Sequence, residues 1–190
     1  MRAAVLAILL TLPACGGGND TPSLDEIASM SEDEAAEMAR KTKDLSGVKA
    51  CELLTASEIE AATGIAPGAP QDMTQVQGQL PMCNWPAGDE SGRTVVSLLV
   101  TRAGQSSYGE FVETSRDQME DMGMEFNEED WQEVPDVGDF GVWVGEEQLG
   151  GMLQVYDDGM MVQVDAETAG GKDELEASKE LARKVFSRLD

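Results

Sequence analysis

The sequence predicts an α+β fold, with one antiparallel sheet and helices packed on it. Apolar and β-branched runs of strand length are separated by short turn signals, and each group of runs precedes a segment with helical periodicity. Strands that follow one another through tight turns pair in an antiparallel sheet, which needs helices to cover it. The two groups predict two pseudo-repeated strand-helix halves, a repeat of pattern without residue-level identity. Of the 190 residues, about 140 would form this domain, the usual size of a single one.

The first fourteen residues have the layout of a bacterial lipoprotein signal peptide. Arg2 supplies a positive charge, the stretch Ala3 to Thr11 is apolar, and Leu12-Pro13-Ala14 precedes Cys15. The apolar stretch is too short to span a bilayer, so it is typical of a cleaved signal. We expect Cys15 to carry lipid, because multiple acyl chains make a stable anchor. An ordinary secretory signal followed by an incidental cysteine is the alternative.

The next segments predict a tether and a spacer before the folded domain. Residues 15–22 contain three consecutive glycines and suit a flexible tether. Residues 23–47 are acidic, carry two capping-box patterns and have a thin apolar stripe, which predicts a helical spacer. The single α+β domain is then expected over residues 48–190.

The first half of that domain contains a helix, two strands and a second helix in order. Thr55-Ala56-Ser57-Glu58 is a capping box, and Gly64 ends the helix that follows it. Strands are expected at 82–85 and 94–102, the second nearly all apolar and therefore central in the sheet. A helix capped by Ser107 should bury Tyr108, Phe111, Val112, Ser115, Met119 and Met122 along one face.

The second half repeats this order with more strands. Strands are expected at 131–134, 140–144, 152–156 and 160–164, the last two joined by Asp157-Asp158-Gly159, a hairpin signal. Gly170-Gly171 then interrupts the chain. The last helix is expected at 173–189. Its inward-facing residues would be Leu175, Leu181, Ala182, Val185, Phe186 and Leu189.

The remaining two cysteines predict a structural disulfide. With Cys15 bound to lipid, Cys51 and Cys83 can pair in only one way in an oxidising compartment. Closing a loop of about 30 residues would stabilise the fold by roughly 3–4 kcal/mol. A reactive thiol pair is the alternative, although such pairs usually occur as Cys-x-x-Cys.

The cysteine motifs also carry a family resemblance. Cys51-Glu52-Leu53-Leu54-Thr55 and Cys83-Asn84-Trp85, with the stretch 135–141 and the late hairpin and helix, resemble a domain-of-unknown-function family of small bacterial envelope lipoproteins. That family is commonest in high-GC Gram-positive bacteria. The resemblance covers roughly residues 48–190 and implies a lipid-anchored extracytoplasmic protein. It supplies no catalytic residues.

Composition excludes several functional classes. The formal net charge of −24 repels nucleic acid and anionic lipid headgroups. The chain has no histidine, the commonest general base and metal ligand. No nucleophile elbow, phosphate loop or dinucleotide fingerprint occurs. We therefore expect neither enzymatic activity nor a cofactor.

An acidic stretch leaves one metal hypothesis open. Nine carboxylates and no basic residue lie between Met119 and Asp139, and Ca²⁺ prefers several carboxylate ligands. The EF-hand spacing is absent, however, and charge runs usually face water. Three tryptophans, Trp85, Trp131 and Trp143, could line a ligand groove, although packing in the core is the expectation.

Together these features predict a non-enzymatic envelope protein that is held by lipid on Cys15. It would bind another envelope protein or a small ligand through its sheet or the groove beside it. A cation-binding lipoprotein is the alternative. The expected location is extracytoplasmic on the cell membrane, or on the outer membrane if the source has two membranes.

Overall fold

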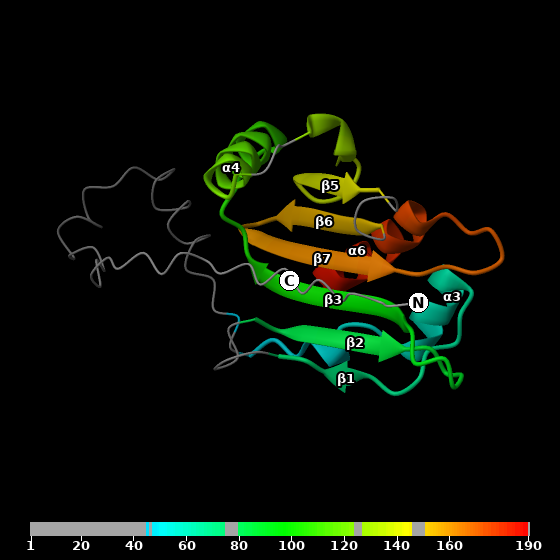
Figure 1. The fold of residues 1–190 in the computed structure, drawn as a ribbon. Helices are drawn as coiled ribbons and strands as arrows, with labels where there is room; N and C mark the ends of the chain where they lie inside the picture. Colours follow the sequence, from blue (N-terminus) through cyan, green and yellow to red (C-terminus); the bar gives the residue numbers. More distant parts are fainter. Residues whose placement is uncertain (1–44, 46, 75–79, 124–126, 146–150, 190) are drawn as a thin grey trace. The chain divides into compact units, whose positions relative to one another are not determined.

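The computed structural model describes residues 45, 47–74, 80–123, 127–145 and 151–189. They form a seven-stranded antiparallel open sheet with three helices packed on it (Figure 1). The predicted α+β class is confirmed. The predicted signal peptide, the tether with Cys15, and the spacer up to residue 44 lie outside the described residues.

The sheet joins two consecutive groups of strands. The first group is β1 (Gln71–Asp72), β2 (Met82–Pro86) and β3 (Thr94–Arg102). The second is β4 (Trp131–Val134), β5 (Phe140–Val144), β6 (Met152–Asp157) and β7 (Met160–Ala166). The order across the sheet is β1-β2-β3-β7-β6-β5-β4, so pairing of β3 with β7 joins the groups. β3 is thus an interior strand, as its apolar run predicts.

Two of the three helices begin at the capping residues that the sequence predicts. The three helices are α3 (Ala56–Thr63), α4 (Tyr108–Asp121) and α6 (Glu174–Leu189), with short 3-10 turns η1 (Ala50–Glu52) and η2 (Glu128–Asp130). Thr55 and Glu58 form the predicted capping box of α3, and Gly64 ends it with φ +77°. Ser107 accepts a hydrogen bond from the Glu110 backbone N–H at the start of α4. Only glycine adopts the Gly64 conformation without a steric penalty.

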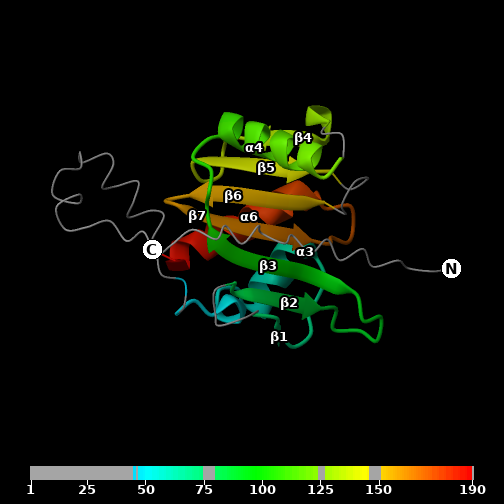
Figure 2. The same ribbon diagram turned by 60° about the vertical axis from the view of Figure 1, so that its left-hand side comes forward.

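The two faces of the sheet are covered by different helices (Figures 1 and 2). One face, here called the helix face, packs against α3 and α6 and carries the main core. Trp85, Leu98, Leu153 and Leu181 are at most 1% exposed in that core. The opposite face, here called the open face, is covered by α4 at its β4–β5–β6 end (Figure 2). In the described part of the chain, no helix packs on the remainder of the open face.

The burial of particular side chains refines the sequence predictions. Trp85 and Trp143 pack in the main core, as expected. Met122 is 56% exposed, so its predicted inward orientation was wrong. The reason is that α4 packs through its first turns, at Phe111 and Val112, whereas Met122 follows its last residue. Leu45 is 3% exposed and belongs to the main core.

Candidate functional site

The disulfide ties the start of the domain to the sheet. Cys51 in η1 and Cys83 in β2 are bonded, as predicted, with their Cα atoms 5.1 Å apart. Cys83 is fully buried in the main core. Cys51 is only partly buried, but a disulfide with one sulfur in the core suits a structural crosslink rather than a reactive site.

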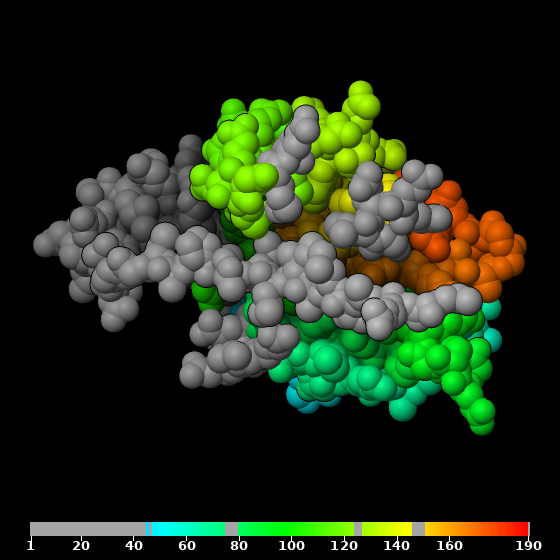
Figure 3. Space-filling model, in the orientation of Figure 1, coloured from blue at the N-terminus to red at the C-terminus, as the bar shows by residue number. Residues whose placement is uncertain are grey.

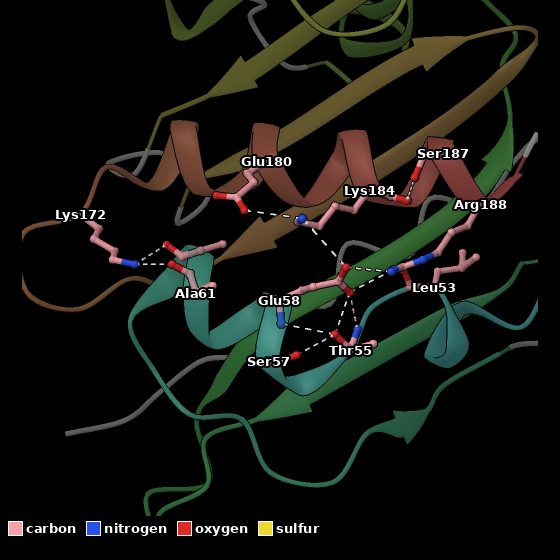
Figure 4. Close-up of polar contacts among 11 residues, drawn as sticks. Leu53, Thr55, Ser57, Glu58, Ala61, Lys172, Glu180, Lys184, Ser187 and Arg188 are labelled. Atoms are coloured by element: carbon pink, nitrogen blue, oxygen red, sulfur yellow. Dashed lines mark hydrogen bonds and ion pairs between the residues drawn. The ribbon is translucent and has the colours of Figure 1, made fainter.

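A polar cluster fixes the last helix to the first (Figure 4). Arg188 of α6 donates to both Glu58 carboxylate oxygens, at 3.0 and 2.7 Å, and also to the Leu53 carbonyl. Thr55 donates to the same carboxylate through its backbone N–H at 2.9 Å and its hydroxyl at 2.8 Å. Arg188 first, and the Thr55 hydrogen bonds after it, lower the pKa of Glu58 to about 2. The cluster joins two helices through contacts within the protein, so we interpret it as structural.

Basic side chains of α6 and of the segment that precedes it make similar contacts. The Lys172 ammonium donates to the carbonyls of Ala61 and Ala62 at the end of α3 (Figure 4). That position is favourable because unsatisfied carbonyls give a helix C-terminus partial negative charge. Lys179 is 7% exposed and lies 2.7 Å from a Glu176 oxygen and 2.9 Å from an Asp136 oxygen. These contacts also belong to the packing of the helices.

The acidic stretch does not converge on one point in the described structure. Asp136 pairs with Lys179 and with Arg183, and hydrogen bonding from Lys179 lowers the pKa of Asp136. Glu128 pairs with Arg116 at 3.4 Å. The other described carboxylates of the stretch lie on α4, η2, β4 and the turn before β5. Among the described residues, no three acidic or cysteine side chains are grouped so that they could hold a metal ion.

Two hollows on the surface are poorly suited to a small-molecule ligand. One, of about 80 Å³, lies at the start of α4 above the stacked rings of Phe140 and Tyr156. Ligand pockets usually measure about 300–1,000 Å³, so this cavity would hold only a few water molecules. The other is an open groove of about 370 Å³ between α3 and α6. Its charged side chains already contact protein groups, as Lys172, Asp173 and Arg183 do.

The open face carries a regular row of half-buried side chains. Along β2, β3, β6 and β7, buried residues that point to the helix face alternate with half-buried ones on the open face. The half-buried set comprises Met82, Asn84, Ser97, Leu99, Thr101, Met152, Gln154, Met161, Gln163 and Asp165. Figure 3 is drawn from this side, with α4 raised at the upper edge.

Polar groups on the open face are arranged across neighbouring strands. The register places Asn84 opposite Ser97, and Ser97 opposite Asp165. The Ser97 hydroxyl donates to the Asn84 side-chain oxygen at 2.9 Å. Gln163 lies opposite Gln154, whose side-chain nitrogen donates to the Gln163 oxygen at 3.4 Å. The face therefore offers amide and hydroxyl groups between methionine and leucine side chains.

Asp165 is a charged residue near one end of this face, second from the end of β7 and opposite the first residue of β6. It lies on β7, the middle strand of the sheet, between Ser97 and Met152. Burial is the main reason that the pKa of Asp165 is raised to about 6, and the negative charge of Glu167 adds to the effect. Glu167 is itself paired with Arg93. Among the described residues no basic side chain pairs with Asp165, which lies in a half-buried surface.

The open face was not singled out by sequence reasoning. The alternation of Ser97, Leu99 and Thr101 with Val96, Leu98 and Val100 was a usable signal within β3. This alternation was missed because the strand was interpreted only as an apolar run. Nothing in the sequence indicates which helix covers which face, so the open position of these side chains required the structure.

Comparisons with known proteins add no assignment for this arrangement. No model of a known protein family matches the chain, and no curated protein matches it. The resemblance to small bacterial envelope lipoproteins therefore stays a prediction. No helix in the described ranges is long and apolar enough to cross a membrane.

Proposed function

We propose that this protein is a lipid-anchored extracytoplasmic domain that binds another component of the cell envelope through its open face. One observation carries the proposal: four strands present half-buried methionine, leucine, amide and hydroxyl groups that α4 leaves uncovered. Methionine-rich surfaces adapt to partner shapes. A mixed apolar and polar surface is also typical of protein interfaces.

The location rests on the predicted lipid at Cys15 and on the disulfide. Disulfides form and persist mainly in oxidising, extracytoplasmic compartments, and the Cys51–Cys83 bond is consistent with that environment. Binding rather than catalysis is proposed because the sequence carries none of the catalytic motifs considered above. A macromolecular partner is favoured over a small ligand because the open face is not enclosed, whereas small-ligand sites are concave.

The arrangement of elements also supports the proposed pseudo-repeat. β1 to β3 precede α4, and β4 to β7 precede α6, so each half is a run of antiparallel strands followed by a helix. The two helices lie on opposite faces of the sheet (Figures 1 and 2). In such a repeat, the helix of the first half would cover one side of the sheet and the helix of the second half would cover the other.

Site-specific photocrosslinking in intact cells tests the proposal. A photoreactive phenylalanine derivative replaces Leu99 on the open face, and a second variant carries it at Glu60, an exposed residue of α3. A discrete crosslinked band at position 99 and none at position 60 is expected. Native mass spectrometry of the same protein extracted from its membranes should find the acyl mass on Cys15. An unacylated protein without a crosslink at position 99 would contradict the proposal.

A further inference from the structure

The dimensions of the open face limit what can cover it. Four adjacent strands, spaced about 4.8 Å apart, give a width of roughly 14 Å, and five residues along a strand give a length of about 17 Å. This is near 250 Å², well below the roughly 800 Å² that each partner buries in a standard interface. An α-helix with its side chains is about 10–12 Å across. One helix beside α4 therefore fits the uncovered width.

Layer architecture favours the same occupant. The helix face is covered by helices, and α4 already covers the β5 end of the open face with Phe111 and Val112. Met161 packs against the cluster under α4, and Leu99 on β3 and Met152 on β6 add further apolar side chains to this face. Sheets are commonly covered by helices on their apolar faces. A second helix in line with α4 would complete the layer.

The charge of Asp165 specifies the chemistry of that helix. Asp165 lies between Ser97 and Met152 without a described basic partner, while the Asn84–Ser97 pair and Gln163 offer hydrogen bonds around it. A helix that covered Asp165 without a cation would bury an uncompensated carboxylate, which is costly. The net charge of −24 attracts basic partners from a distance as well.

We infer that the open face binds one amphipathic helix of a partner protein, with a lysine or arginine of that helix paired with Asp165. The inference rests on the proposed function and specifies its partner. The apolar residues of the helix would pack on Leu99, Met152 and Met161. The Ser97 hydroxyl and the side-chain amide oxygens of Asn84 and Gln163 would accept hydrogen bonds from the N–H groups of that lysine or arginine.

Binding of two matched synthetic peptides tests this chemistry. Both are amphipathic helices of about 16 residues, roughly 24 Å long, with leucine and alanine on one face. One carries lysine at the centre of that face and the other carries glutamate there. Fluorescence anisotropy measures their binding to the protein. The protein is the exported chain from residue 15 onward, and it carries Cys15→Ser so that no lipid is attached. The matched protein variants are Asp165→Asn and Glu60→Gln, which each remove one negative charge.

The expected result is selective binding of the lysine peptide. Asp165→Asn should weaken it about tenfold or more, as expected for loss of a charge-assisted pair, while Glu60→Gln should change it less than about twofold. Equal loss in both variants, equal binding of the two peptides, or no binding at about 1 mM would overturn the inference.

Other occupants of the face give distinct results. A dimer in sedimentation velocity that Leu99→Glu dissociates would assign the face to a second copy of the chain. Peptide binding that requires deletion of residues 23–44 would assign it to the predicted spacer. Either result overturns the inference. A crosslink at position 99 in cells without peptide binding would retain the proposed function and reject only the basic helix.

Discussion

The ion pair between Glu58 and Arg188 should contribute measurably to stability, and its contribution should depend on pH. The substitution Glu58→Gln removes the negative charge but keeps a side chain that serves in capping boxes. It therefore tests the contribution of the ion pair with Arg188 separately from the contribution of the capping box to α3. The carboxylate also contacts Lys184 at 3.9 Å, so the variant removes the anion that both basic side chains of α6 share.

The expected loss of stability follows from the lowered pKa of Glu58. Each pKa unit corresponds to about 1.4 kcal/mol, so lowering the Glu58 pKa from 4.5 to about 2 sets an upper limit of about 3 kcal/mol. The side chain is 21% exposed and water screens part of the interaction, so we expect a loss of about 1–2 kcal/mol. For a domain of this size that lowers Tm by roughly 3–6 °C.

The sign of the pH dependence is fixed by the direction of the shift. A carboxylate whose pKa is lowered by folding stabilises the protein fully above its unfolded pKa, here 4.5, and loses that contribution as the pH falls towards about 2. The Tm difference between the protein and Glu58→Gln should therefore be constant above about pH 5 and shrink below it. Glu60→Gln, on the same helix, is the control and should have little effect.

Thermal unfolding followed by circular dichroism from pH 7 to pH 3 measures the difference. The reasoning is refuted if Glu58→Gln lowers Tm equally at pH 7 and pH 3, since the effect would then not come from the charge. It is also refuted if Glu60→Gln lowers Tm as much as Glu58→Gln does. Because both proteins share all the other carboxylates, comparing their Tm values at the same pH cancels the contributions of those groups.

Four further outcomes are expected. Replacing Cys51 and Cys83 with serine should cost about 3–4 kcal/mol, and an unchanged Tm with both cysteines replaced would contradict a stabilising disulfide. Gly138→Ala should cost about 3 kcal/mol in urea unfolding, more than Gly92→Ala at about 1–2 kcal/mol. Both have positive φ, but the added Cβ at Gly138 would lie 2.6 Å from the Tyr156 carbonyl oxygen, whereas Gly92 is open; equal losses would refute the clash. Asp165→Asn should stabilise the protein by about 1–2 kcal/mol at pH 7 and by much less near pH 4, because folding raises the pKa of Asp165 from 3.8 to about 6 and so penalises its ionised form; no gain at pH 7 would contradict its burial. A calcium site with Kd of about 1 mM would raise Tm by roughly 3–6 °C in 10 mM Ca²⁺, and we expect no such rise; a shift of that size would support the cation-binding alternative.

Local sequence signals predicted most of the elements. β4 and β5 were predicted with the bounds that the structure shows, because turn residues separate two short segments that begin and end with apolar residues. α3 was predicted from its capping box and terminal glycine, which act within a few residues of each other. β1 was not predicted, because two exposed residues in a stretch rich in proline and glycine carry no periodicity.

The candidate site depended on contacts between distant parts of the chain. Asn84, Ser97, Gln154, Gln163 and Asp165 come from four strands, and only their register places them on one face. The same limit applies to the ion pair of Glu58 with Arg188, whose residues are 130 positions apart. Periodicity can place residues on one side of a strand, but it does not identify the neighbouring strand.

The sequence by itself determined the fold class, most of the strand and helix segments, and the only available cysteine pairing after the predicted lipid site. These depend on local propensities and on the composition of the chain. The tertiary structure decided that β3 pairs with β7, that α4 and α6 cover opposite faces, and that Asp165 is half-buried in the part of the open face that no described helix covers. Those features arise from packing of whole elements, whose free energy is shared among residues far apart in the sequence.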